Sequence, residues 1–280
     1  FKPVLNLLDS PSKGLLIADE VGLGKTIEAG LVWTELRSRF DASKLLIVCP
    51  AMLREKWVRE LRNRFGVSAQ IADARDLYST LEQVKKGETK GFALVCSKDG
   101  LRPPKGFDSL DDKDPDMSPR AVLSRFFLEK EADDPLFDLV VVDEAHYMRN
   151  QESMTSKLGR LIRPVTDYMI LLSATPIQLH SQDLYQLLKI LDDQTYAYLS
   201  SFEQVLAANQ PINCLHEAVQ RGGISNTEFH DLLDKALLHP LLANSRQLKH
   251  LKSKAFQVKE LDKPETRAEI AGDLEKINLL

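Results

Sequence analysis

A short glycine loop followed by a lysine and a hydroxyl is the clearest chemical feature of this sequence. Its five consecutive residues are Gly22, Leu23, Gly24, Lys25 and Thr26. The apolar residues 14–18 before the loop predict a buried strand, and residues 27–40 after it predict a helix. In phosphate-binding loops, backbone N–H groups and the positive end of the following helix face phosphate oxygens. We therefore expect Lys25 to reach the β- and γ-phosphates of a nucleotide and Thr26 to offer its hydroxyl to Mg²⁺.

The loop departs from the strict pattern G-x-x-x-x-G-K-[ST] at one position. Asp19 stands where that pattern has its first glycine. A Gly-Lys-Thr sequence between a strand and a helix is also compatible with an ordinary helix N-terminus. The loop alone is therefore a moderate indication of nucleotide binding.

An acidic pair stands at the end of a second apolar run, residues 137–142. Asp143 and Glu144 follow this predicted strand, and His146 lies just beyond them. In an α/β nucleotide fold, the first carboxylate is placed to hold Mg²⁺ through water, and the second to orient or deprotonate the attacking water. The alternative is a pair that only caps the next segment, beside an ordinary loop histidine. The glycine loop on an earlier strand favours the catalytic interpretation.

Two hydroxyls, Ser173 and Thr175, follow the apolar residues 168–172. At a strand end they could hydrogen-bond the carboxylate and the histidine of the neighbouring strand. Such bonds would change when the γ-phosphate leaves. A plain Ser/Thr turn is the alternative, and the hydroxyls by themselves favour it.

Apolar runs alternate with helical patterns over most of the chain. The predicted strands are residues 14–18, 44–49, 68–71, 92–97, 137–142 and 168–172. Continuous apolar strands between helices predict an α/β fold with a mainly parallel sheet covered by helices on both faces. Residues 99–119, which are rich in proline and aspartate, predict a mobile surface insertion. After about residue 181 only helices are predicted, at residues 181–191, 202–209, 212–220, 227–238 and 264–280.

Composition bounds the class of protein. The chain has 280 residues, of which 43% are hydrophobic and 28% charged, as expected of a globular protein with a sizeable core. The net charge of −4 argues against a surface coated with basic groups for nucleic acid, but it does not bear on a local basic stripe. The three cysteines contain no C-x-x-C pair, so neither a disulfide framework nor a zinc site is indicated. No apolar run is long enough for a membrane span, so we expect no membrane partner.

Taken in order, the three motifs resemble motifs I, II and III of superfamily-two helicases. They occupy residues 19–26, 143–146 and 173–176. The longer run ADEVGLGKTIEAGL, residues 18–31, is similar to the Swi/Snf group of helicase-like DNA translocases and to its bacterial RapA (HepA)-like branch. Ala145 favours that branch, because eukaryotic remodellers usually have glycine at this position.

The resemblance implies a role for each site residue. It makes residues 1–192 the first RecA-like lobe of a two-lobe motor that binds ATP. Catalysis would rest on Lys25, Asp143 and Glu144. Mg²⁺ would be held by Thr26 and Asp143. The coupling residues, which would link the ATP state to the grip on DNA, are His146, Ser173 and Thr175.

By the same resemblance, the protein would track one strand of duplex DNA through its phosphates. Residues 45–61 resemble motif Ia of the group, and residues 94–102 are similar in position to motif Ib. The matching residues are Pro50, Ala51, Arg54, Arg59, Ser97 and Lys98. Backbone N–H groups, hydroxyls and cations contact phosphates without reading bases. A solvated outer face is an equal alternative for the arginine-rich helix predicted at residues 52–65.

Residues 193–280 resemble the branch only loosely, as a helical extension that leads toward a second RecA-like lobe. We expect that lobe, with the arginines that complete the ATP site, to belong to a longer form of the same chain. An adenine-reading glutamine is expected before Phe1, because residues 1–13 contain none in a matching position. Residues 1–280 alone are therefore expected to hydrolyse ATP very poorly.

The sequence predicts an ATP-dependent double-stranded DNA translocase, located in the bacterial cytoplasm and associated with the nucleoid. A strand-separating DNA or RNA helicase is one alternative, and a regulatory nucleotide-binding module with little turnover is another. The intact acidic pair, Lys25 and Thr26 argue against the regulatory module, and residues 18–31 argue against the helicase by resemblance. The pathway, the protein partners and the role of the helical extension are left open.

Overall fold

The computed structural model describes residues 2–18, 24–109, 117–130, 135–173, 181–253, 263–275 and 277. The chain divides into two compact units, Phe1–Ala197 and Tyr198–Leu280. The boundary predicted from the sequence, after residue 192, lies shortly before this division. Within the described ranges, no helix combines the length and the apolar character needed to cross a bilayer.

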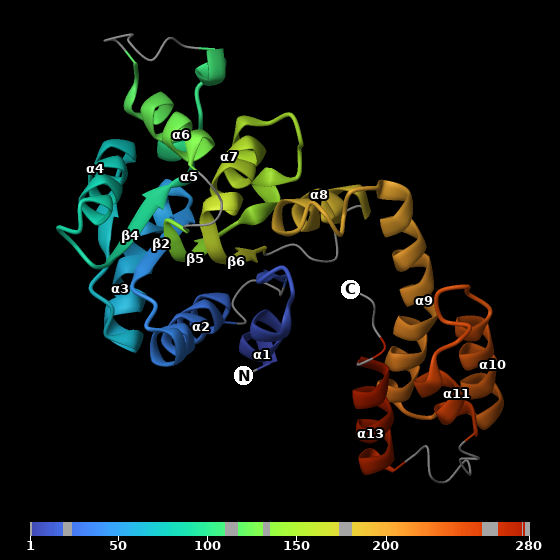
Figure 1. The fold of residues 1–280 in the computed structure, drawn as a ribbon. Helices are drawn as coiled ribbons and strands as arrows, with labels where there is room; N and C mark the ends of the chain where they lie inside the picture. The colour runs from blue at the N-terminus through green and yellow to red at the C-terminus, as the bar shows by residue number, and fades with distance from the viewer. Residues whose placement is uncertain are drawn as a thin grey trace. The chain divides into compact units, whose positions relative to one another are not determined.

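A parallel sheet of six strands forms the centre of the first unit (Figure 1). The strands are β1 (Gly14–Ile17), β2 (Lys44–Cys49), β3 (Gln70–Ala72), β4 (Phe92–Ser97), β5 (Phe137–Val142) and β6 (Thr166–Leu172). Their order across the sheet is β1-β6-β5-β2-β4-β3, and every neighbouring pair is parallel. Parallel neighbours need crossover connections, which the intervening helices provide. This arrangement confirms the predicted α/β fold with a mainly parallel sheet.

Helices cover both faces of this sheet (Figure 1). One face packs against α1 (Lys2–Asp9), α2 (Lys25–Phe40) and α3 (Arg54–Phe65). The other packs against α4 (Ala74–Lys85), α6 (Pro119–Glu129), α7 (Met154–Ile162) and α8 (Ser181–Leu191). Along β2, Leu45 and Ile47 face the first group, whereas Leu46 and Val48 face the second. Because both faces are buried, the strands appear in the sequence as uninterrupted apolar runs.

The start of the predicted surface insertion is folded against the first unit. The short helix α5 (Lys98–Leu101) follows β4 directly, and the 3-10 turn Phe107–Ser109 places the Phe107 ring fully inside the core. The ammonium group of Lys157 lies 4.7 Å from the centre of that ring and donates to Asp108 at 3.0 Å. Phe107 therefore anchors the segment, while residues 110–116 lie outside the described residues.

Helices are the only regular elements among the described residues of the second unit, as predicted. Its helices are α9 (Leu199–Arg221), α10 (Asn226–Leu237), α11 (Arg246–Ser253) and α13 (Pro264–Glu275). The sequence predicted a break in the first of these at Pro211, but α9 is continuous through it. Pro211 has no backbone N–H, so the helix loses one hydrogen bond at this residue. Ala208 and Ile212, on either side of it, are buried in the core of this unit. Burial on both sides keeps the helix intact, since tertiary packing supplies most helix stability in proteins.

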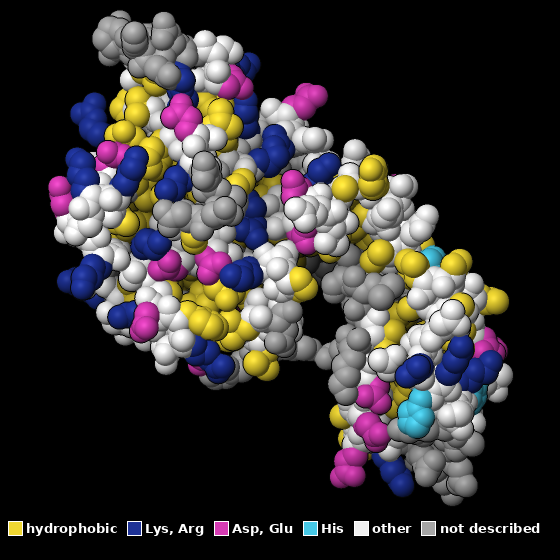
Figure 2. Space-filling model, in the orientation of Figure 1, with side chains coloured by type: hydrophobic (Ala, Val, Ile, Leu, Met, Phe, Trp, Pro, Cys, Tyr) yellow, Lys and Arg dark blue, Asp and Glu magenta, His cyan; other side chains and the backbone are white. Residues whose placement is uncertain are grey.

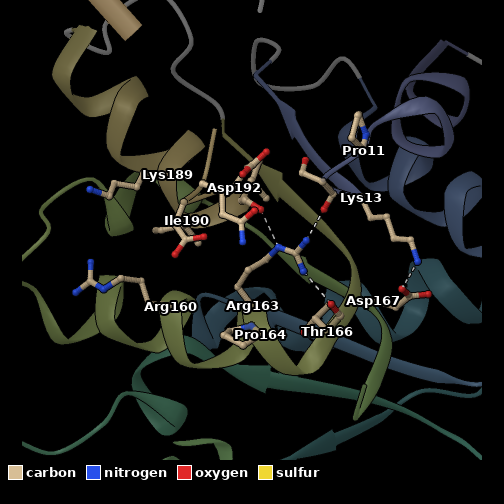
Figure 3. Close-up of a pocket in the computed structure, with 14 residues that line it drawn as sticks. Pro11, Lys13, Arg160, Arg163, Pro164, Thr166, Asp167, Lys189, Ile190 and Asp192 are labelled. Carbon is tan, nitrogen blue, oxygen red and sulfur yellow. Dashed lines mark hydrogen bonds and ion pairs between the residues drawn. The ribbon is translucent and has the colours of Figure 1, made fainter. Parts of the chain in front are cut away.

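Arg163 holds three chain segments together at the N-terminal edge of the sheet (Figure 3). Its Nε donates to the carbonyl of Leu191 at 2.9 Å, and one Nη donates to the carbonyl of Thr166 at 2.8 Å. The other Nη donates to the carbonyl of Ser12, just before β1. Burial lowers the pKa of Arg163, and the nearby Asp192 carboxylate counteracts that shift. The guanidinium thus joins the starts of β1 and β6 to the end of α8.

Replacing Arg163 with methionine should lower the free energy of unfolding by about 2–4 kcal/mol, because three backbone carbonyls lose a charged donor. Urea unfolding monitored by circular dichroism measures the change. Lys189→Met is the matched control, since Lys189 and Arg163 line one surface pocket and the described contact of Lys189 is with the ring of Tyr185. Equal stability of the two variants would contradict the role given to Arg163.

Candidate nucleotide site and nucleic-acid face

The C-terminal ends of the strands lie along one edge of the sheet, because all neighbouring strands are parallel. Ile17 at the end of β1 is in register with Leu172 of β6. The predicted nucleotide residues follow three neighbouring strands, with the glycine loop after β1, Ser173 after β6 and the acidic pair after β5. The sheet therefore gathers the three motifs on one half of this edge, which we call the nucleotide half.

The predicted nucleic-acid residues occupy the next two strand ends. Pro50 follows β2, and Ser97 ends β4. The strands β2 and β4 are neighbours, with Cys49 in register with Ser97. Since β2 also pairs with β5, this second half of the edge begins beside the acidic pair. We call it the nucleic-acid half.

The described part of the glycine loop ends at the start of helix α2. Gly24 is the N-cap residue of α2, with a φ of 95° and no side-chain hydrogen bond that caps the helix. Lys25 and Thr26 form its first turn and are half-buried. The first N–H groups of a helix lack partners within the helix, and the helix dipole makes this end positive. Gly22 and Leu23 lie outside the described residues.

Asp143 is held by two donors, one on each carboxylate oxygen. The indole N–H of Trp57, on α3, donates to Oδ2 at 2.8 Å. The backbone N–H of Glu144 donates to Oδ1 at 2.9 Å. The Asp143 backbone N–H itself continues the sheet and donates to the carbonyl of Val48 at 2.8 Å. The carboxylate is thus fixed in orientation, and each oxygen keeps acceptor capacity for a further partner.

Glu144 adopts a backbone conformation that side chains seldom take. Its φ and ψ are 54° and 47°, in the left-handed region that costs a non-glycine residue about 1–2 kcal/mol. The turn Ala145–Met148 follows, and its first and last side chains are buried, which fixes the conformation. Glu144 Oε2 lies 3.1 Å from Nδ1 of His146, without the alignment of a hydrogen bond. Glu144 is therefore held in a strained turn at the end of β5, with its Oε2 buried beside His146.

The hydroxyl motif is described only at its first residue. The Ser173 backbone N–H donates to the carbonyl of Ile17 at 2.9 Å, and its side chain is fully buried. Among the described residues, its Oγ has no hydrogen-bond partner, so the predicted bond to the carboxylate or the histidine is not made there. Thr175 lies outside the described residues.

The nucleic-acid half presents backbone, hydroxyl and cationic groups. After Pro50, the 3-10 turn Ala51–Leu53 leads into α3, and Arg54 Nε donates to the carbonyl of Ala51 at 3.2 Å. Arg59, further along α3, is exposed. Figure 2 shows Lys and Arg side chains spread over the visible face of the first unit among acidic ones. Basic and acidic side chains are therefore interspersed on this face, in agreement with the negative net charge of the chain.

Ser97 and Lys98 start the short helix α5. Ser97 Oγ accepts from the backbone N–H of Gly100 at 3.0 Å, which leaves its hydroxyl proton free to donate. The ammonium of Lys98 lies 4.2 Å from the centre of the Tyr147 ring and 3.3 Å from the Asp99 carboxylate. Tyr147 also packs against His146, with ring centres 4.4 Å apart. A contact chain thus runs from Lys98 to the acidic pair.

Sequence reasoning missed Trp57 and Tyr147 as members of the site. Trp57 lies on the apolar side of its helix, in the four-residue spacing with Leu53 and Leu61, so the pattern assigned it to packing alone. The only available signal was its chemistry, because a buried indole N–H usually finds an acceptor. Nothing local indicated that the acceptor would come from β5.

Similarity to known proteins extends over most of the chain. A family model described as the SNF2-related domain matches residues 4–263. RNA polymerase-associated protein RapA of Vibrio vulnificus (strain YJ016) is 30% identical over 255 residues, or 88% of this chain and 24% of that protein. RapA of Yersinia pestis (strain Pestoides F) is 31% identical over 245 residues, or 83% of this chain and 23% of that protein. The chain spans about a quarter of the length of these curated relatives.

One solved structure is also similar. It is the Sulfolobus solfataricus SWI2/SNF2 ATPase core in complex with double-stranded DNA, with 15% sequence identity and a TM-score of 0.46. The similarity covers 98% of this chain and 62% of that one.

Replacing Gly24 with alanine should weaken the binding of a non-hydrolysable ATP analogue by about 5- to 30-fold, since a positive φ costs a side chain about 1–2 kcal/mol. Isothermal titration calorimetry measures the affinity. Gly66→Ala is the matched control, because Gly66 also has a positive φ, of 63°, at the C-terminal end of α3. The same loss of affinity in both variants would contradict a nucleotide site at Gly24.

Proposed function

Because the chain belongs to the SNF2-related family, we propose that it forms the ATP-binding motor lobe of a double-stranded DNA translocase. Family membership confirms the resemblance to the Swi/Snf group and its RapA-like branch that residues 18–31 indicated. In the proposed activity, ATP hydrolysis drives movement along duplex DNA, and separation of the strands is not required.

One observation carries this proposal. The nucleotide half and the nucleic-acid half share a single sheet edge, and two contacts join them. Trp57 of α3 donates to Asp143, and Lys98 of α5 lies over the ring of Tyr147. A motor that couples hydrolysis to movement needs physical connections of this kind between its two ligands.

The residues of the nucleotide half fit Mg²⁺ and ATP. The helix start at Gly24 offers N–H groups to phosphate, and Lys25 supplies a cation in the first turn of α2. Asp143 and the hydroxyl of Thr26 would hold Mg²⁺, which neutralises charge on the β- and γ-phosphates when it is bound. Among the described residues, no group of three or more His, Cys, Asp or Glu could hold a metal. A site with few protein ligands is typical of Mg²⁺, because water molecules and substrate phosphates supply most of its ligands.

Glu144 is the proposed general base. Its carboxylate belongs to the strained turn that follows β5, where it would orient a water molecule for attack on the γ-phosphate. His146 lies within reach of this carboxylate and packs against Tyr147. We assign His146, Ser173 and Thr175 to coupling between the ATP state and the grip on DNA.

Duplex DNA would be held through its phosphates alone. The turn after Pro50 offers the backbone of Ala51, and Arg54 and Arg59 add cations on α3. Ser97 can donate its hydroxyl proton, and Lys98 has three N–H donors. Such contacts carry no sequence information, as movement along DNA of any sequence requires. The second RecA-like lobe of the full chain would close the site.

Triplex displacement distinguishes translocation from strand separation. The protein at its full natural length should displace a third strand from triplex DNA in an ATP-dependent manner and leave the two duplex strands paired. Unwinding of the duplex would favour the helicase alternative. ATP binding with neither activity would favour the regulatory module.

Lys25→Ala and Glu144→Gln should each lower kcat for ATP by at least about 100-fold in the full-length protein, because a charge stabiliser or the general base is lost. Steady-state phosphate release measures the rate. Glu152→Gln is the control, since Glu152 is an exposed carboxylate in the loop after the acidic pair. Near-normal turnover in either variant would refute its catalytic assignment.

Arg59→Gln should weaken duplex DNA binding and reduce the slope of log K against log salt by about 1, as expected for one lost phosphate contact. Fluorescence anisotropy at several salt concentrations gives the slope. Arg64→Gln is the matched control on the same helix, because Arg64 is exposed and paired with Glu60. An unchanged slope in the Arg59 variant would favour a solvated outer face for α3.

A further inference from the structure

Trp57 makes a hydrogen bond that its place in the core does not require. Its side chain is only 2% exposed, and its N–H donates to Oδ2 of Asp143 at 2.8 Å. The other tryptophan, Trp33 on α2, is equally buried at 3% exposure. Within the described part of the chain, the Trp33 N–H has no hydrogen-bond partner. Burial alone therefore does not account for the contact between Trp57 and Asp143.

The bond joins two parts of the molecule that have different proposed ligands. Trp57 belongs to α3, the helix that carries Arg54 and Arg59. Asp143 follows β5, on the nucleotide half of the sheet edge. Leu61, one turn further along α3, is also buried, so the inner side of the helix is packed against the sheet. A shift of α3 under load from a DNA phosphate would therefore move the donor of Asp143.

The two donors on Asp143 have different freedom to move. The N–H of Glu144 belongs to the adjacent peptide and stays with the carboxylate. The N–H of Trp57 comes from another segment, far away in the sequence. Only the second donor can report on the position of α3, and it acts on the carboxylate that the proposed function gives to Mg²⁺.

We propose that Trp57 is a positioning residue that orients Asp143 for Mg²⁺·ATP and links this carboxylate to the DNA-contacting helix α3. The inference rests on the proposed function, since it assumes that Asp143 serves Mg²⁺ and that α3 contacts DNA. Partners that orient a metal ligand typically change metal affinity or activity by about 10- to 100-fold when they are removed.

Trp57→Phe and Trp33→Phe test the positioning role without DNA. Both keep an aromatic ring in the core, but only the first removes a donor to Asp143. Mg²⁺ is titrated into the full-length protein with a fluorescent, non-hydrolysable ATP analogue. The Mg²⁺ concentration for half-maximal binding should rise about 10-fold in Trp57→Phe and stay near the wild-type value in Trp33→Phe. An unchanged value in a folded Trp57→Phe protein would overturn the proposal.

Trp33→Phe also leaves Trp57 as the only tryptophan of residues 1–280, so its fluorescence reports on the contact directly. Placed in a full-length background with no other tryptophan, this emission should change when Mg²⁺ joins the bound nucleotide. If Trp57→Phe fails to fold, this fluorescence measurement still tests whether Trp57 orients Asp143. Constant emission on addition of Mg²⁺ would overturn the proposal.

Duplex DNA separates failure of the link from failure of the proposed function. In the wild-type protein, DNA should shift the Mg²⁺ concentration for half-maximal binding of the ATP analogue. In Trp57→Phe, DNA should shift this concentration much less. An equal shift in both proteins would overturn the link through Trp57. If DNA neither binds nor alters the wild-type protein, the proposed function fails, while the titrations without DNA still decide whether Trp57 orients Asp143.

Discussion

The uniform direction of the strands is the constraint on which the site depends. A parallel sheet places the C-terminal ends of all its strands along one edge, so residues that are far apart in the sequence lie close together there. The order β1-β6-β5-β2-β4-β3 then sets which of them become neighbours. It places the three nucleotide motifs side by side and puts β2 and β4, with the nucleic-acid residues, next to the acidic pair. Five strands, β1, β6, β5, β2 and β4, lead into the site residues. If one of them were antiparallel to the others, its site residues would lie at the opposite edge of the sheet.

Side-chain contacts connect the nucleotide half of the sheet edge with the nucleic-acid half. Asp143 receives one donor from its own turn and one from α3, so its orientation depends on a helix outside its strand. Lys98 reaches the ring of Tyr147, which packs against His146. Both connections cross from β2 or β4 to the strand end of β5. The backbone strain at Glu144 is maintained by the buried residues that follow it, so the acidic pair is held in place before any ligand binds.

The sequence was sufficient for the features that depend on local patterns. Strands buried on both faces appear as apolar runs, and the glycine loop and the acidic pair stand at strand ends, so the α/β fold and the site edge could be predicted. Features decided by distant partners could not. Phe107 anchors a segment whose composition indicated a mobile surface, and packing around Pro211 overrides the break that proline predicts. The acceptor of Trp57 lies on another strand, which helical periodicity cannot reveal.

Steady-state ATP hydrolysis by the full-length protein, at fixed salt, tests the central claim most directly. The rate is compared without nucleic acid and with duplex DNA, single-stranded DNA and RNA. If the two halves of the sheet edge serve ATP and duplex DNA, duplex DNA should stimulate hydrolysis most strongly. Stronger stimulation by single strands or RNA would contradict the assignment to a double-stranded DNA translocase, and so would a rate that none of the nucleic acids changes.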